Sequence, residues 1–166
     1  MDTKKLARSA LIVALALALQ SIRLVLPLPP MLSAFLIGCF VHTMLVVARR
    51  YAGLLTAVLL SLLLPCTAYA QGQLRLIILV PLVMAGNILF VYLVGVFTEG
   101  WKQYAIPAAA KAVFLSCAWT FCATKLVHID VPALLLPVLF SMSVPQLVTG
   151  AVGVWSGEKL LKRLKL

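Results

Sequence analysis

Apolar residues occur along this chain in long runs, and charged or turn-forming residues are concentrated in short segments between the runs. Each run is long enough to cross the hydrocarbon core of a bilayer as a helix, which takes about 17–25 residues. The pattern therefore predicts an all-α integral membrane protein: one domain over residues 1–166, folded as a compact bundle of six transmembrane helices. The predicted spans are 6–26, 31–48, 52–69, 76–97, 104–126 and 131–155.

The segments between the runs contain residues that end helices. Proline has no backbone N–H to donate, and it disfavours helical geometry in the residue before it. Glycine and paired charges mark the other ends. The predicted breaks are Pro27-Leu28-Pro29-Pro30, Arg49-Arg50, Pro65 with Gln71-Gly72-Gln73, Glu99-Gly100, and His128-Ile129-Asp130.

Composition excludes a water-soluble globular protein. Of the 166 residues, 64% are apolar and 11% are charged, against about half and a quarter in soluble domains. The same numbers exclude a disordered chain. Six spans of about 20 residues leave only short loops. We therefore expect no separate soluble catalytic domain, and any energy source must lie in other subunits.

The charges predict the orientation of the chain. Its 14 Lys and Arg residues against 4 Asp and Glu give a net charge of +10. With six spans, ten basic residues fall on one side and three on the other. The positive-inside rule then places both termini in the cytoplasm. The basic residues thus serve topology and contact with anionic lipid, and we expect no nucleic-acid partner.

A few polar residues lie inside the spans. A polar side chain in lipid costs free energy unless it is paired, so each of these residues is a functional candidate. If the helices bundle, these side chains could converge on a cavity open to the outside. Such a cavity suits a small polar molecule with a carboxylate, which an arginine can bind bidentately. Alternatively, the amides hold helices together and the arginine contacts headgroups. The candidate binding residues are Arg23, His42, Asn87 and Gln146 in the spans, with Gln71 and Gln73 in the outer loop after the third span.

Lys111 is also inside a span, about seven residues from its predicted cytoplasmic end. We expect its long side chain to extend to that interface rather than to bind a ligand. No acidic residue lies within a predicted span, although coupled transporters generally use one. No Walker, zinc-protease or nucleophile-elbow motif is present. The sequence thus predicts no enzyme, no catalytic residue, no metal site and no cofactor.

Alanines recur every three or four residues along one face of the first helix. Close backbone approach over small residues supplies helix packing in lipid. This face can pack on the chain's own helices or on a partner membrane protein, and both interpretations stay open. For the glycines of the sixth helix, packing within the chain is favoured. The docking residues are Ala10, Ala14 and Ala18; the glycines are Gly150, Gly153 and Gly157.

Together these features resemble the substrate-binding S component of energy-coupling-factor vitamin transporters. Three short segments extend the resemblance over most of the chain, although His42 stands where those relatives often have Asn. The segments are Gly38-Cys39-Phe40-Val41-His42, Pro81-Leu82-Val83-Met84-Ala85-Gly86-Asn87 and Pro145-Gln146-Leu147-Val148-Thr149-Gly150.

The resemblance implies a multi-pass protein of the bacterial inner (cytoplasmic) membrane that captures a vitamin-like micronutrient outside the cell. It also implies docking, through the alanine face, onto a membrane scaffold (T) subunit driven by two cytoplasmic ATPases. The main alternative is a scaffold without transport activity, similar to the rod-shape-determining protein D of wall synthesis. Such a scaffold needs no ligand cavity.

Overall fold

The computed structural model describes residues 3–26, 29–74, 76–126 and 132–164. Over these residues the chain is helical, with no strand. The first three helices are followed by a turn at Gln71–Gln73, and α4 to α6 follow. The helices are α1 (Thr3–Ser21), α2 (Pro30–Val47), α3 (Leu54–Ala70), α4 (Leu79–Val96), α5 (Lys102–Phe121) and α6 (Pro132–Leu164).

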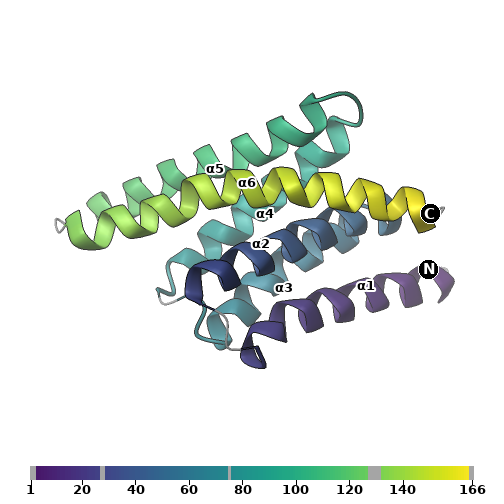
Figure 1. Cartoon of the computed structure of the whole chain (residues 1–166), viewed down its shortest axis with the longest axis horizontal. Helices are drawn as coiled ribbons and strands as arrows, with labels where there is room; N and C mark the ends of the chain where they lie inside the picture. Colours follow the sequence, from purple (N-terminus) through teal and green to yellow (C-terminus); the bar gives the residue numbers. More distant parts are fainter. Residues whose placement is uncertain (1–2, 27–28, 75, 127–131, 165–166) are drawn as a thin grey trace.

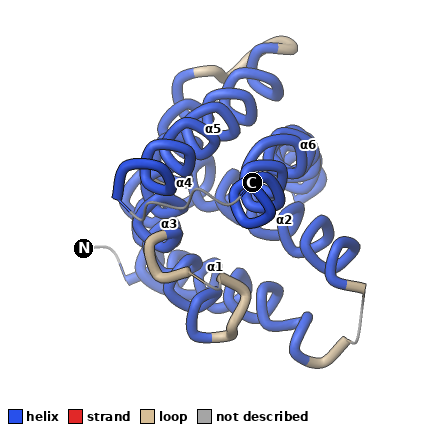
Figure 2. The backbone as a smooth tube through the Cα atoms, turned by 90° about the vertical axis from the view of Figure 1, so that its left-hand side faces the viewer, coloured by secondary structure: helices blue, strands red, loops and turns tan. Residues whose placement is uncertain are grey.

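The helices form a bundle in which α2, α4, α5 and α6 surround the centre. Helix α6 packs against α2 and α5, and α4 packs against α3 and α5. Helix α1 lies at the edge, against α2 and α3. Figure 1 shows the two ends of the chain at the same end of the bundle, and Figure 2 shows α1 apart from α5 and α6.

Several predicted helix ends are wrong in position. The first α-helix ends at Ser21, before its predicted end at residue 26, and the chain continues as a 3-10 turn, Ile22–Leu24. Helix α2 ends at Val47, close to its predicted end, but Arg49 and Arg50 do not break the helical path, which continues as a π-helical turn, Ala48–Ala52. Gly53 then breaks the helix with a φ of 100°, a conformation that glycine adopts without steric cost. Pro65 lies inside α3, and α6 continues well past its predicted end at residue 155.

Small residues allow α2 and α6 to approach closely. A methyl group added at Gly38 would meet the Thr149 side chain at 3.0 Å, and one at Gly157 would meet Val46 at 2.8 Å. Between them, a methyl group at Gly153 would overlap the Cβ of His42. The glycines of α6 therefore pack within the chain, as the sequence favoured.

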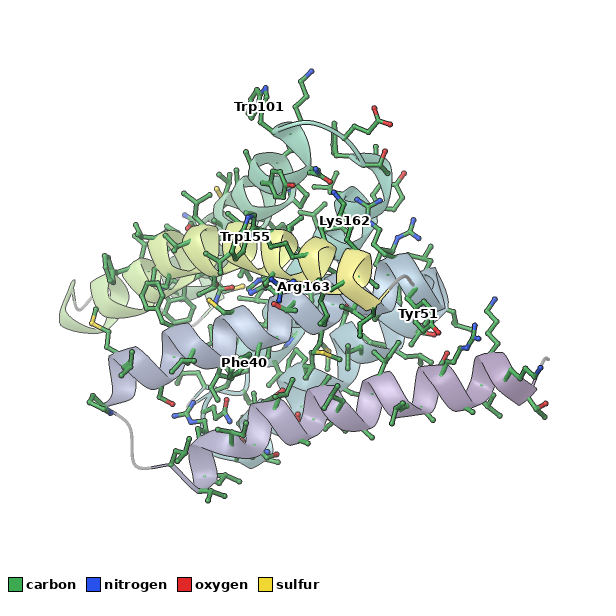
Figure 3. All side chains as sticks on the ribbon, turned by 45° about the vertical axis from the view of Figure 1, so that its right-hand side comes forward. Phe40, Tyr51, Trp101, Trp155, Lys162 and Arg163 are labelled. Atoms are coloured by element: carbon green, nitrogen blue, oxygen red, sulfur yellow. The ribbon has the colours of Figure 1, made fainter. Side chains whose placement is uncertain are left out.

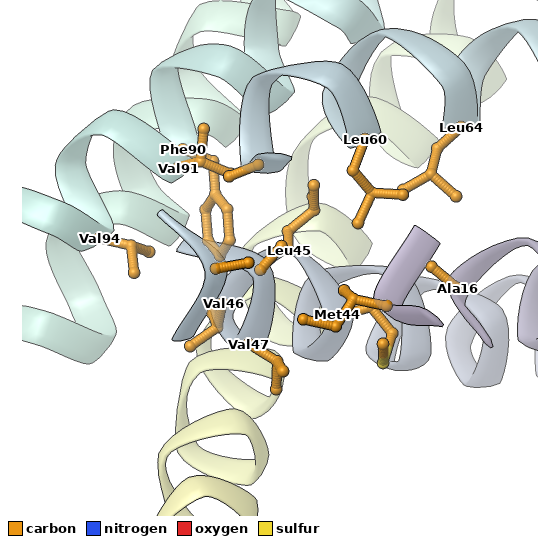
Figure 4. Close-up of a cluster of buried hydrophobic side chains, with 14 of the residues drawn as sticks. Ala16, Met44, Leu45, Val46, Val47, Leu60, Leu64, Phe90, Val91 and Val94 are labelled. Carbon is orange, nitrogen blue, oxygen red and sulfur yellow. The ribbon is translucent and has the colours of Figure 1, made fainter. Parts of the chain in front are cut away.

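The apolar core lies between α2, α3 and α4. Leu45, Leu60, Phe90 and Val94 are completely buried there, and α1 adds Ala16 at its edge. Figure 4 shows these side chains facing one another across the helices. A second cluster, around Leu79, Leu115 and Trp119, joins α4 to α5.

The outer surface of the bundle is apolar. Large side chains on separate helices are exposed, including Leu11 at 70%, Leu55 at 69% and Val113 at 62%. Four helical stretches in the described ranges are long and apolar enough to cross a membrane, and α3 is a shorter apolar helix of 17 residues. These features are those of a multi-pass membrane protein. The four stretches are Thr3–Leu24, Met31–Ala52, Leu79–Val96 and Lys102–Lys125.

An ion pair and a hydrogen bond join the helices at the end of the bundle that holds the termini, and a cation–π contact lies within α6 there. Arg50 donates to Glu158 of α6 at 2.9 Å and to the carbonyl of Phe97 after α4 at 3.2 Å. The ammonium of Lys159 lies 3.9 Å from the centre of the Trp155 ring. Figure 3 shows Trp155, Lys162 and Arg163 along the C-terminal part of α6.

Candidate ligand-binding site

A cavity of about 120 Å³ lies within the bundle. Polar residues of five helices and of the α3–α4 turn line it, between apolar walls that include Ile37, Val41, Leu64 and Val83. The polar lining comes from side chains far apart in sequence: Gln20, His42, Gln73, Asn87, Lys111 and Gln146.

At the centre of this lining, three buried side chains from three helices meet. The Nζ of Lys111 lies 2.7 Å from Nε2 of His42 and donates to Oδ1 of Asn87 at 2.7 Å. Each of the three side chains is at most 2% exposed. We call these residues the Lys111 cluster. It holds α2, α4 and α5 together through polar contacts within the bundle.

The geometry determines which nitrogen of His42 has the hydrogen. Nδ1 of His42 lies 2.7 Å from the carbonyl oxygen of Gly38, which can only accept, so Nδ1 is the donor. In the neutral ring Nε2 then accepts from Lys111. The His42 ring also meets Phe90 edge-on, with the ring centres 4.9 Å apart, so its orientation is fixed from both sides.

Two amide oxygens of the lining have no partner. Gln20 donates through Nε2 to the carbonyl of Leu64 at 3.0 Å and to Oγ1 of Thr67 at 3.1 Å. A carbonyl oxygen can only accept a hydrogen bond, so the amide nitrogen of Gln20 must face Leu64 and its Oε1 faces away from these partners. Within the part of the chain that the structure describes, the buried Oε1 atoms of Gln20 and Gln146 accept no hydrogen bond. Leaving such an acceptor unpaired costs about 1–3 kcal/mol.

Four of the six predicted binding residues line the cavity: His42, Gln73, Asn87 and Gln146. The other two do not. Gln71 donates to Oγ of Ser21 at 2.8 Å and accepts from Nε2 of Gln73, so it joins the α3–α4 turn to the end of α1. Arg23 is half-buried in the 3-10 turn after α1, outside the cavity lining.

The prediction that Lys111 extends to the membrane interface is wrong. Lys111 lies nine residues after Lys102, where α5 begins, which corresponds to about 14 Å of helix rise. Its side chain turns inward to His42 and Asn87 instead. The predicted span began at residue 104, and α5 begins two residues earlier, so Lys111 lies deeper in the helix than the sequence indicated.

Gln20 was also absent from the predicted site. It is the last residue but one of α1, and Ile12, Ala16 and Gln20 form the buried face of that helix. The four-residue spacing of Ile12, Ala16 and Gln20 is the signal that could have identified it, because it places the glutamine on the packed face.

The alanine face of α1 lies outside the bundle. Ala10, Ala14 and Ala18 are exposed, and Leu11 and Leu15 beside them are also exposed. Packing of these alanines on the chain's own helices, one of the two open interpretations, is therefore excluded in this structure. The face is available to lipid or to another membrane protein.

Comparisons with protein-family models, with curated proteins and with solved structures find no match to this chain. The function must therefore be argued from the cavity and the surfaces of the chain itself.

Proposed function

We propose that the chain is the substrate-binding membrane subunit of an energy-coupling-factor importer. It captures a small polar, vitamin-like molecule in the cavity around the Lys111 cluster and releases it inward when it is docked to an ATP-driven module. The chain itself hydrolyses no ATP in this proposal, and separate subunits do so.

One observation supports the proposal most strongly: five helices direct polar groups into one cavity and leave two buried amide oxygens without a partner. Side chains that only hold helices together satisfy one another, because an unpaired polar group in lipid is costly. A ligand with matching donors would complete the set. A scaffold of the wall-synthesis type has no need for such a cavity.

The proposal includes six membrane spans with both termini in the cytoplasm. Helix α3, with 17 residues, has a rise of about 25 Å, and the 33 residues of α6 are more than enough to span. Basic residues of α1, of the Ala48–Ala52 turn and of the C-terminal part of α6 favour the cytoplasm at the end with the termini. The α3–α4 turn, and the cavity beside it, then face outward.

The exposed alanine face of α1 is the proposed contact with the membrane scaffold subunit. It combines small residues, which allow close backbone approach, with exposed leucines that would pack on a partner helix. The energy for transport would reach this subunit through that contact.

The experiment is native mass spectrometry of the tagged chain, extracted gently from its own membranes. The proposal predicts a bound small molecule together with a co-purifying membrane subunit and ATPases. Wall-synthesis proteins as partners, with no small molecule bound, would support the scaffold alternative and refute the importer.

A further inference from the structure

The charge of Lys111 is not balanced by the described part of the chain. The acidic side chains in these ranges are Glu99, which is exposed, and Glu158, which pairs with Arg50. Glu99 follows α4, and Glu158 is in the C-terminal part of α6. Both therefore lie at the end of the bundle that holds the termini. The groups around the lysine are an imidazole, an amide and, 5.8 Å away, the Phe90 ring. A buried ammonium without a counterion is unstable relative to a paired one.

The hydrogen bonds of the cavity are also incomplete. One N–H donor and two carbonyl acceptors, at different places in its lining, lack partners among the described residues. An ammonium has three hydrogens, and those of Lys111 that point to His42 and Asn87 account for two. Among the described residues, no acceptor faces the third. Gln20 and Gln146 supply carbonyl oxygens that lack donors. The cavity thus requires an acceptor at its centre and donors at its walls.

We propose that the substrate is a small organic acid: its carboxylate or equivalent anion neutralises Lys111, and its N–H or O–H groups donate to Gln20 and Gln146. This deepens the proposed function and rests on it. The anion-binding residue is Lys111 rather than Arg23, which the sequence favoured and which lies outside the cavity lining. Cations and substrates that present only acceptors are rejected, because they leave either the ammonium or the amide oxygens unpaired.

The cavity limits the size and shape of this acid. Its volume of about 120 Å³ is below the roughly 300–1,000 Å³ of sites for drug-sized ligands. Ile37, Val41, Leu64 and Val83 contribute apolar walls. A single ring, or a short chain of similar size, with polar groups at its ends fits this arrangement.

The test is ligand binding to the purified full chain in nanodiscs, measured by native mass spectrometry with a library built from matched triples. The first triple is 4-aminobenzoate, 4-aminobenzamide and benzoate, which vary the anion and the N–H donor one at a time. Other triples repeat this design on different rings and short chains, and simple amines are included. Among the compounds that bind, we expect acids with donors to be preferred about tenfold or more over their amides, as for a charge-assisted hydrogen bond.

Two variants assign the preference to its residue. In Lys111→Met, the affinities for the acid and for its amide should lie within about twofold of each other. The control is Lys125→Met, at an exposed lysine beyond α5, which should keep the roughly tenfold preference for the acid. If Lys111→Met does not fold, Gln146→Glu provides the test. It adds a carboxylate to the cavity lining and should weaken acids about tenfold while sparing the amides.

The outcomes separate this inference from the proposed function. Preferred binding of amines or neutral amides by the unaltered chain would overturn the acid assignment but leave a small-molecule binder. Loss of the acid preference in Arg23→Met, with its retention in Lys111→Met, would overturn the role of the lysine. If no compound binds to any form, both the binding function and the inference fail.

Discussion

Replacing Gly153 by alanine should destabilise the protein although alanine is the better helix former. In a helix, alanine is favoured over glycine by about 1 kcal/mol. At this position, however, the added methyl group would overlap Cβ of His42 and would lie 3.0 Å from its carbonyl carbon and 3.1 Å from its Cα. Backbone atoms cannot move away by rotating a side chain, so α2 and α6 must separate.

The magnitude follows from these opposing effects. Overpacking costs about 1–3 kcal/mol when neighbours can shift and more when they cannot. Separation of the two helices would also weaken the contact of Gly157 with Val46 and the 2.6 Å contact between the hydroxyls of Thr43 and Ser156. We therefore expect Gly153→Ala to lower the free energy of unfolding by about 1–2 kcal/mol.

Gly95→Ala is the matched control. A methyl group there would overlap the guanidinium of Arg49, which is the far end of a flexible side chain. Its displacement breaks one hydrogen bond, from Nε of Arg49 to the carbonyl of Val91 at 3.1 Å. That loss, about 1 kcal/mol, is offset by the helix preference for alanine. The net change should be close to zero.

Both variants can be measured by reversible unfolding in detergent, followed by tryptophan fluorescence, with the buried Trp119 as a reporter. If Gly153→Ala is as stable as Gly95→Ala, the close packing of α2 on α6 is not as rigid as the distances imply, and the reasoning fails.

Three further predictions concern the site, the outer face and the ion pair. Asn87→Ala should weaken substrate binding by about 1–3 kcal/mol, because it removes the acceptor that orients Lys111; unchanged affinity in a titration would remove Asn87 from the site. Ala14→Trp should block uptake into cells without altering binding by the purified chain, and normal uptake would exclude docking through that face. Glu158→Gln should cost at most about 1 kcal/mol in thermal unfolding, because its ion pair with Arg50 is partly exposed; a larger loss would mean that the pair does more than join the Ala48–Ala52 turn to α6.

The sequence predicted the helices well because the apolar runs are long and the breaks between them are short. It misplaced the helix ends where local signals were weaker than packing. Pro65 remains inside α3 although proline removes a backbone donor. Arg49 and Arg50 remain helical because their side chains find partners on α4, α6 and the residue after α4. Such partners are distant in sequence and cannot be read from the local pattern.

The site was predicted in part for a similar reason. Mid-span polar residues are few, so His42, Asn87 and Gln146 could be expected to share one region. The direction of the Lys111 side chain could not be predicted in this way, because a long side chain at that position can reach either the interface or the interior. Only the positions of His42 and Asn87 on neighbouring helices decide between them. Gln71 and Arg23 were excluded by the path of the chain at the end of α1.

His42 makes two polar contacts and one ring contact in the bundle. An asparagine and a histidine can each offer an acceptor to a lysine. In this chain the histidine does so through Nε2 while Nδ1 bonds to Gly38 in the preceding turn. His42 therefore offers an acceptor to Lys111 and a ring that packs on Phe90.

The central claim is that the cavity around the Lys111 cluster holds a small molecule. The most direct test compares native mass spectra of three forms of the chain, all extracted gently from the same cells: the unaltered protein, Ala68→Phe and Ala70→Phe. Ala68 lines the cavity, and Ala70 is exposed at the end of the same helix. The account predicts one small molecule bound to the unaltered chain and to Ala70→Phe, and none bound to Ala68→Phe. An unaltered chain without a bound molecule, or a molecule retained by Ala68→Phe, would contradict it.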